Sequence, residues 1–238
     1  KVLLEGQGAD ELLGGYHGYL HARIRSLLEQ GKYAKLLSFL KGWGEWPGRS
    51  FGNGLMQLGS ILLPETIHPL ARKLFRRSPR PKWIKDRGLK EEGISFSGPR
   101  ADLDEEASGR RLSEALRNAL TGKGLTALLR HSDRNSMRWS IESRVPFLTT
   151  DLAEFLLGLP EDYLVSGRGE TKSVFRLAMK GIVPDTVLNR RDKVGFSTPE
   201  RDWLASLGKK PLSWLEGLKS IPFLDFDASL TAYGEALE

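Results

Sequence analysis

The feature that most constrains this chain is a short apolar run, residues 2–4, that continues directly into a glycine-rich segment. Val2, Leu3 and Leu4 have the pattern of a strand that is buried on both faces, and such a strand needs neighbouring strands. No other segment of the 238 residues reads as a comparable strand followed by a crossover helix. We therefore expect a mainly α-helical piece of an α/β domain, with most of its parallel sheet upstream of Lys1.

Most of the remaining sequence predicts helices. Apolar residues recur at helical spacing between residues 16 and 41, and Gly31 marks a break between two helices there. Further helices are expected within 55–63, 70–75, 112–120, 125–137, 152–157, 171–180 and 203–207. Segment 42–108 is richer in glycine, proline and charge, and we expect it to be a variable, poorly ordered insert.

The composition excludes several classes of protein. A hydrophobic share of 39% and a charged share of 28% are typical of a globular chain. No window approaches the roughly 18 apolar residues of a membrane span, so we expect a cytoplasmic protein without a membrane partner. The chain has no cysteine, which excludes disulfides, zinc–cysteine sites and a thiol nucleophile within it.

The net charge of +6 is unevenly distributed. Residues 72–90 contain nine lysines and arginines opposed by Asp86, whereas residues 91–106 contain six acidic residues and Arg100. A solvated insert whose halves compensate each other explains this pattern, and a nucleic-acid site is the alternative. We favour the insert, because the aromatic residues among the basic ones are limited to Phe75 and Trp83.

The first segment that could carry chemistry follows the predicted strand. Gly6-Gln7-Gly8 allows a ligand to approach the backbone closely, and the start of the next helix offers free amides to an anion. Asp10 and Glu11 lie in the first turn of that helix, where the helix dipole favours carboxylates even without a function. A tight turn without a ligand therefore remains an alternative.

Three later segments carry charge at suggestive positions. Residues 133–148 include Glu142 and Arg144, which would not face each other on a helix, so a salt bridge to other elements is their simplest role. Lys172 and Arg176 lie four residues apart on the predicted helix 171–180 and would repel unless an anion lay between them. A basic loop follows at residues 189–199. The histidines are interpreted as surface or packing residues, because no third zinc ligand accompanies His17 and His21.

Taken in order, these segments resemble the synthetase domain of the glutamine-dependent asparagine synthetases, a family of ATP-pyrophosphatases. The matching sequences are EGQGADELLGGY, DRNSM with SIESRVPFL, GETKSVFRLA and RRDKVGFSTP, and they span residues 1 to about 203. The resemblance implies an adenine nucleotide alpha hydrolase-like fold, which is Rossmann-like and typical of PP-loop ATPases. This chain would be the carboxy-terminal part of that domain, covering residues 1–238.

The resemblance also implies a reaction and its site. A carboxylate, the aspartate side chain in asparagine synthetases, attacks ATP to give an acyl-adenylate, and ammonia then displaces AMP to form an amide. Lys172 matches the catalytic lysine that contacts phosphate oxygens, and Asp10 matches a ligand of Mg²⁺. Gly6, Gln7 and Gly8 match the turn against the nucleotide. Arg176 and Lys193 lie in matching motifs and either extend the cationic ATP site or serve the structure.

Two departures from the family pattern restrict these expectations. Asparagine-specific members have glutamate where this chain has Gln7, which cannot accept a proton at neutral pH. The Ser-Gly-Gly-x-Asp-Ser pyrophosphate loop and the glutaminase domain with its cysteine do not occur in the chain.

We therefore expect the isolated chain to be inactive and to work with an upstream glutaminase domain. The substrates would be ATP, a carboxylate and ammonia from glutamine, without nucleic acid, and the sequence leaves a homodimer open. The alternatives are a relative that amidates a sugar acid or a peptide, and a non-catalytic scaffold of the same fold.

Overall fold

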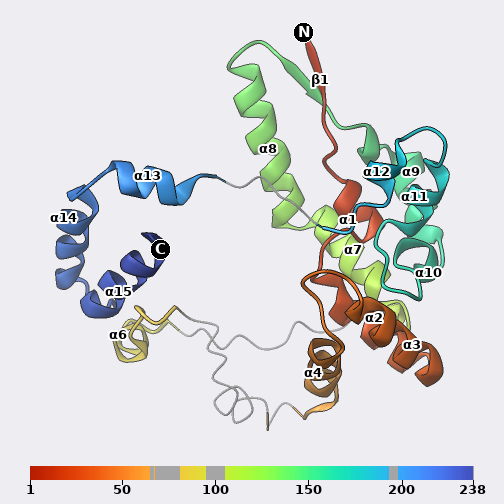
Figure 1. Cartoon of the computed structure of the whole chain (residues 1–238), viewed down its shortest axis with the longest axis horizontal. Helices are drawn as coiled ribbons and strands as arrows, with labels where there is room; N and C mark the ends of the chain where they lie inside the picture. The colour runs from red at the N-terminus through yellow and green to blue at the C-terminus, as the bar shows by residue number, and fades with distance from the viewer. Residues whose placement is uncertain (65–66, 68–80, 95–104, 193–197, 238) are drawn as a thin grey trace. The chain divides into compact units, whose positions relative to one another are not determined.

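The computed structural model describes residues 1–64, 67, 81–94, 105–192 and 198–237. The chain divides into two compact units, the first formed by residues 1–63 and 103–192 and the second by residues 64–102 and 193–238. Figure 1 traces the elements of each unit along the chain. Lys193 and the helix expected at 70–75 lie outside the described residues.

The predicted first strand is confirmed and belongs to a two-stranded parallel sheet. β1 (Val2–Leu4) pairs with β2 (Glu142–Arg144), with Leu3 opposite Ser143. The three apolar side chains of β1 are nevertheless exposed by 54%, 47% and 68%. The described part of the chain therefore does not bury the strand that the sequence predicted to be buried on both faces.

β2 corrects the interpretation of Glu142 and Arg144. Residues two apart point to the same face of a strand, whereas they diverge on a helix. Glu142 and Arg144 accordingly face each other, and Arg144 Nε donates to Glu142 Oε1 over 2.9 Å. The two charges compensate each other within one strand rather than reaching to other elements.

The helices of the first unit agree with most of the predicted segments. The expected break at Gly31 is confirmed, because this residue has φ +67° and separates α2 from α3. Along the chain the helices of this unit are α1 (Ala9–Leu13), α2 (Tyr19–Glu29), α3 (Tyr33–Gly44), α4 (Phe51–Leu62), η1 (Glu105–Ala107), α7 (Arg111–Thr121), α8 (Lys123–Met137), η2 (Pro146–Leu148), α9 (Thr150–Gly158), α10 (Glu161–Leu164), α11 (Ser173–Ala178) and α12 (Asp185–Leu188).

The core of the first unit lies where α1, α2, α3 and α7 meet. Leu12, Ile24 and Leu112 are completely buried there, each from a different helix. α4 packs on α2 and α3, and Gly54 lies directly against Leu40. The beginning of the segment expected to be an insert is thus an integral part of this core.

A buried ion pair joins three helices of this unit. Arg23 of α2 and Glu161 of α10 are both 3% exposed and 2.8 Å apart, and Arg23 also contacts Asp162. The second carboxylate oxygen of Glu161 accepts the backbone N–H of Ser113 in α7 over 2.9 Å. Hydrogen bonds on both oxygens offset part of the cost of burying this carboxylate.

The second unit brings two segments that are distant in sequence together. Ile84 and Leu224 form an antiparallel bridge, with Lys85 N–H donating to Phe223 O and Asp225 N–H donating to Trp83 O, both over 2.8 Å. The elements are α6 (Asp86–Glu91), α13 (Glu200–Ser206), α14 (Lys210–Gly217), η3 (Leu218–Ser220) and α15 (Phe226–Leu237). The carboxy-terminal segment therefore packs on part of the expected insert.

Length and hydropathy together argue against a transmembrane helix in the described part of the chain. No helix there combines enough residues with enough apolar character to span a bilayer.

Replacing Glu161 by Ala should destabilise the first unit by about 3 kcal/mol or more, because Arg23 would keep a buried charge without its main partner. Glu142→Ala is the matched control, since it breaks an exposed glutamate–arginine pair and should cost much less. Urea denaturation followed by circular dichroism measures both. Equal losses in the two variants would contradict a structural role for the buried pair.

Candidate functional site

The candidate site starts at the turn that leads from β1 into α1. Gly8 has φ +90°, and Gly14, at the other end of α1, has φ +68°. Both values lie in the left-handed region that side chains disfavour, so glycine is required at each position. Gly6 and Gln7 reach the surface, whereas Gly8 is buried and a Cβ there would overlap the side chain of Leu148.

The two residues expected to bind metal and phosphate contact each other. Lys172 Nζ lies 2.8 Å from Asp10 Oδ1, and the side chains are 30% and 28% exposed. Gly15 makes this pairing possible, because a Cβ on Gly15 would overlap Asp10 Oδ1 and come within 2.7 Å of Lys172 Cε. The result is a carboxylate and an ammonium group, both accessible, beside a glycine turn.

Backbone contacts bring Lys172 to α1. Its N–H donates to Leu13 O over 3.1 Å, and Thr171 forms an antiparallel bridge with Val165. Lys172 itself has φ +57°, a left-handed conformation that costs energy for a residue other than glycine. Such strain persists when the surroundings over-determine a conformation, and it is common at functional sites.

Lys172 and Arg176 do not share a helix face as predicted. α11 begins at Ser173, so Lys172 caps the helix in a left-handed conformation and its side chain pairs with Asp10. Arg176 Nε donates to Thr171 O over 3.0 Å, and Nη1 donates to Leu188 O at the end of α12. Arg176 therefore ties the loop of Lys172 to the segment that precedes residues 189–192.

The second carboxylate of α1 has a structural environment. Glu11 is buried and accepts a hydrogen bond from Tyr16 over 2.8 Å. Burial, followed by the hydrogen bond and charge of Glu11, raises the pKa of Tyr16, and burial raises that of Tyr19 to about 12. Glu11 is thus engaged by Tyr16, whereas Asp10 faces Lys172.

The donor set at Asp10 suits a metal that a ligand brings with it. Across the described residues, no three histidine, aspartate or glutamate side chains converge as a metal site. Mg²⁺ is commonly held by one or two carboxylates together with substrate phosphates and water. One accessible carboxylate beside the glycine turn fits that mode of binding.

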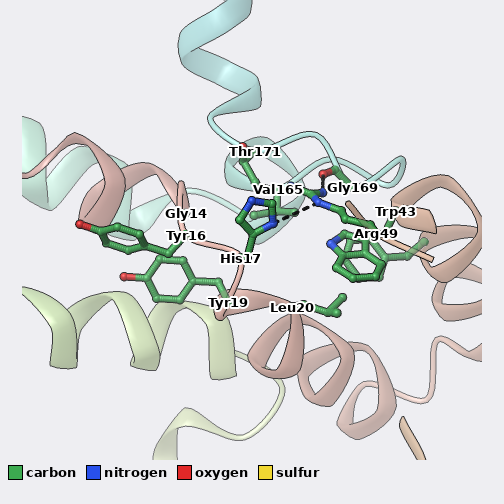
Figure 2. A pocket seen from close by; sticks show the side chains of 11 residues that line it. Gly14, Tyr16, His17, Tyr19, Leu20, Trp43, Arg49, Val165, Gly169 and Thr171 are labelled. Carbon is green, nitrogen blue, oxygen red and sulfur yellow. Dashed lines mark hydrogen bonds between the residues drawn. The ribbon is translucent and has the colours of Figure 1, made fainter. Parts of the chain in front are cut away.

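A joint of aromatic and charged residues is formed by His17, Trp43, Trp46, Arg49 and Gly169, most of which are labelled in Figure 2. Arg49 extends between His17, in the segment after α1, and Gly169, in the loop before Lys172. The cavity at this joint is about 10 Å³, which corresponds to roughly one water molecule. The cavity is therefore too small for a nucleotide, although His17 beside it is exposed.

Sequence reasoning did not single out this joint. Trp43, Trp46 and Arg49 recur every three residues, a spacing that would have indicated a shared face had the segment not been interpreted as an insert.

Ser132, which directly precedes the DRNSM motif, donates to Glu5 and places α8 beside the end of β1. The motif at 133–137 therefore lies on a helix that contacts the sheet.

The fold and the site together define an α/β domain with an accessible carboxylate–ammonium pair at the turn after its first strand. The chain belongs to the asparagine synthase family, whose model matches residues 1–220. This agrees with a PP-loop type of α/β domain that is represented here mainly by its helices.

Curated relatives lead to the same family. The chain is 30% identical over 209 residues to "Asparagine synthetase [glutamine-hydrolyzing] 1" of Bacillus subtilis, covering 85% of this chain and 31% of the relative. It is 31% identical over 218 residues to a "Putative asparagine synthetase [glutamine-hydrolyzing]" of Mycobacterium bovis, covering 86% and 30%. The chain thus spans about a third of the length of these relatives. No solved structure gives a significant match.

The two glycines of the turn should respond differently to alanine. Gly8→Ala should destabilise the first unit by about 1–2 kcal/mol, because alanine is strained at φ +90° and would press on Leu148. Gly6→Ala should change stability by less than about 0.5 kcal/mol, because no atom lies within 4 Å of its Cβ position. Thermal unfolding of the two variants measures this contrast, and an equal loss would refute the assigned turn geometry.

Proposed function

We propose that this chain is the carboxy-terminal portion of a synthetase domain that uses ATP to activate a carboxylate and then converts it into an amide. Membership of the asparagine synthase family and the names of the relatives support the reaction class. The observation that carries the proposal is the Asp10–Lys172 pair beside the Gly6-Gln7-Gly8 turn. The pair would supply one fixed cation and one possible metal ligand, and the open space around Gly6 would let a ligand approach the backbone.

The proposed reaction has two steps. A carboxylate oxygen attacks the α-phosphorus of ATP, and the bond from that phosphorus to the bridging oxygen breaks, releasing pyrophosphate. The nitrogen of ammonia then attacks the acyl carbon, AMP leaves with the electron pair, and the nitrogen loses a proton. Negative charge builds on phosphate oxygens in the first step, where an ammonium donor stabilises the transition state most effectively.

Lys172 is the residue we propose for that role. Its ammonium group is positioned by the left-handed backbone and the hydrogen bond to Leu13, and it remains accessible. Asp10 would hold Mg²⁺ together with the phosphates, and that ion would neutralise phosphate charge. Gly6, Gln7 and Gly8 would lie against the nucleotide. Arg176, through its carbonyl contacts, would hold this loop in place, and Lys193 would extend the cationic surface.

The carboxylate substrate we propose first is the aspartate side chain, in line with the names of the relatives. Gln7 favours a second candidate, because an amide at this position cannot act as a general base. That candidate is a sugar acid or a peptide carboxylate, amidated by the same chemistry. A scaffold that keeps the fold without activity is the remaining alternative.

The amide nitrogen would come from glutamine, as in the names of the relatives. Because the chain has no cysteine, a cysteine-dependent glutaminase would have to lie in another part of the protein. The exposed apolar side chains of β1 lie on both faces of the strand, which suits a parallel sheet whose faces are covered by further elements. We therefore place an upstream glutaminase domain and pyrophosphate loop among the partners, together with a homodimer as an open option.

The proposal is tested with full-length protein, ATP, Mg²⁺, ammonia and a panel of carboxylates, with pyrophosphate release as the readout. Lys172→Met should lower turnover by roughly a hundredfold or more, because a donor to the transition state is lost. Lys180→Met is the matched control and should retain turnover, because Lys180 is exposed and lies two residues after the end of α11. If the full-length wild-type protein releases no pyrophosphate with any carboxylate, only the scaffold alternative remains. ATP–pyrophosphate exchange by the isolated 238-residue chain would contradict the expectation that this chain is inactive alone.

Gly15→Ala should separate Asp10 from Lys172 and reduce pyrophosphate release by roughly tenfold to a hundredfold, because small displacements of catalytic groups are costly. Gly18→Ala is the control, since no atom lies within 4 Å of its Cβ position. Steady-state rates and melting temperatures of both variants are compared. Full activity in folded Gly15→Ala would argue against a role for the pair.

A further inference from the structure

The loop that precedes Lys172 contacts the end of α3 and the turn that follows this helix. Trp46 Nε1 donates to Arg168 O over 3.1 Å, and Arg49 Nη1 donates to Gly169 O over 3.0 Å. The backbones also touch, because a Cβ on Gly169 would come within 2.7 Å of Trp43 Cα. Two side chains and one backbone contact from a single segment thus fix the loop three to four residues before Lys172.

Arg49 also reaches the other half of the candidate site. Its Nε donates to His17 Nδ1 over 3.3 Å, which requires a lone pair on that nitrogen. His17 lies in the short segment between Gly15, which accommodates the Asp10–Lys172 pair, and α2. One guanidinium therefore bridges the segment after Asp10 and the loop before Lys172, as Figure 2 shows.

The surroundings of Arg49 restrict its movement. The guanidinium carbon lies 5.2 Å from the ring centroids of both Trp43 and Trp46, within cation–π range. Arg191 approaches Trp46 as well, at 5.4 Å. Burial lowers the pKa of Arg49, and the aromatic faces and two hydrogen bonds offset part of that desolvation. An arginine that stacks on two tryptophan rings and donates two hydrogen bonds has a fixed orientation that a lysine side chain would not reproduce.

We propose that Arg49 is a positioning residue that sets the distance and orientation between Lys172 and Asp10 by clamping the Gly169 carbonyl to His17. The proposal rests on the proposed function of Lys172. Arg49 touches neither member of the pair in the contacts described here, so it would act through the loop backbone. The direction of the Lys172 side chain depends on that backbone, because the residue has φ +57° and follows a loop with glycines at 167 and 169.

The test uses full-length protein and two substitutions, Arg49→Met, which keeps the aliphatic part of the side chain, and Arg49→Lys, which keeps one cationic donor. Arg138→Met is the matched control, because Arg138 stacks on Trp139 at 6.0 Å outside the joint. Two readouts are taken from each folded variant. These are kcat and KM for ATP, and amide hydrogen exchange of the peptide covering residues 164–172.

Arg49→Met should lower kcat by roughly tenfold to a hundredfold with KM for ATP within about twofold, because misplacement of a catalytic group affects the transition state most. Amide hydrogen exchange in residues 164–172 of Arg49→Met should become faster. Arg49→Lys should recover part of the loss in kcat and part of the change in exchange, and Arg138→Met should match wild type in both. Unchanged exchange, or a kcat loss that only follows the folded fraction, would overturn the proposal. If Arg49→Met does not fold, Arg49→Lys decides by the same readouts.

The two proposals fail separately. Wild-type protein without pyrophosphate release would refute the proposed function, and hydrogen exchange would still decide the positioning role. Faster amide hydrogen exchange of residues 164–172 in the Arg49 variants would support the positioning role, whereas unchanged exchange would refute it. An active wild type combined with a fully active, folded Arg49→Met would refute the positioning role alone.

Discussion

The first unit depends on the way in which α1 is buried. A helix of five residues is too short to persist by itself, so its conformation comes from packing. Ala9, Glu11, Leu12 and Leu13 are all buried, and their contacts determine the rotation of the helix. Asp10 must consequently point away from the core. The same packing presents the carbonyl of Leu13 to the N–H of Lys172, so that one buried turn determines where both members of the pair lie.

The loop before Lys172 is anchored at both ends and in its middle. The Arg23–Glu161 pair fixes α10, and Val165, where the loop begins, donates its N–H to Glu161 O over 2.9 Å. Arg49 holds the middle through Gly169, and Arg176 holds the end through Thr171. Arginine suits these positions because its planar group makes several directed hydrogen bonds, to carboxylates for Arg23 and to backbone oxygens for Arg49 and Arg176. Much of the positive charge near the candidate site thus organises backbone.

Features with a local cause could be predicted from the sequence. Helical spacing located α2, α3, α7, α8 and α9, and glycine at residue 31 located the break between two of them. The expectation that Glu142 and Arg144 form salt bridges to other elements was wrong, because a run of three residues does not reveal a strand without its pairing partner. The helical period likewise predicted that Lys172 lies on a helix face. In the structure Lys172 precedes the helix in a left-handed conformation, its N–H binds Leu13 O, and Thr171 pairs with Val165.

The sequence by itself determined the glycine turn after β1, the carboxylates in the following helical turn, and the ordered motifs that indicated the family. These are properties of neighbouring residues, governed by backbone sterics and helical periodicity. Only the tertiary structure decided that Lys172 meets Asp10, that Arg176 binds carbonyl groups, and that Arg49 contacts a loop 120 residues further along the chain. Such pairings depend on how helices pack around a shared core, and residue spacing along a chain carries no direct record of that packing.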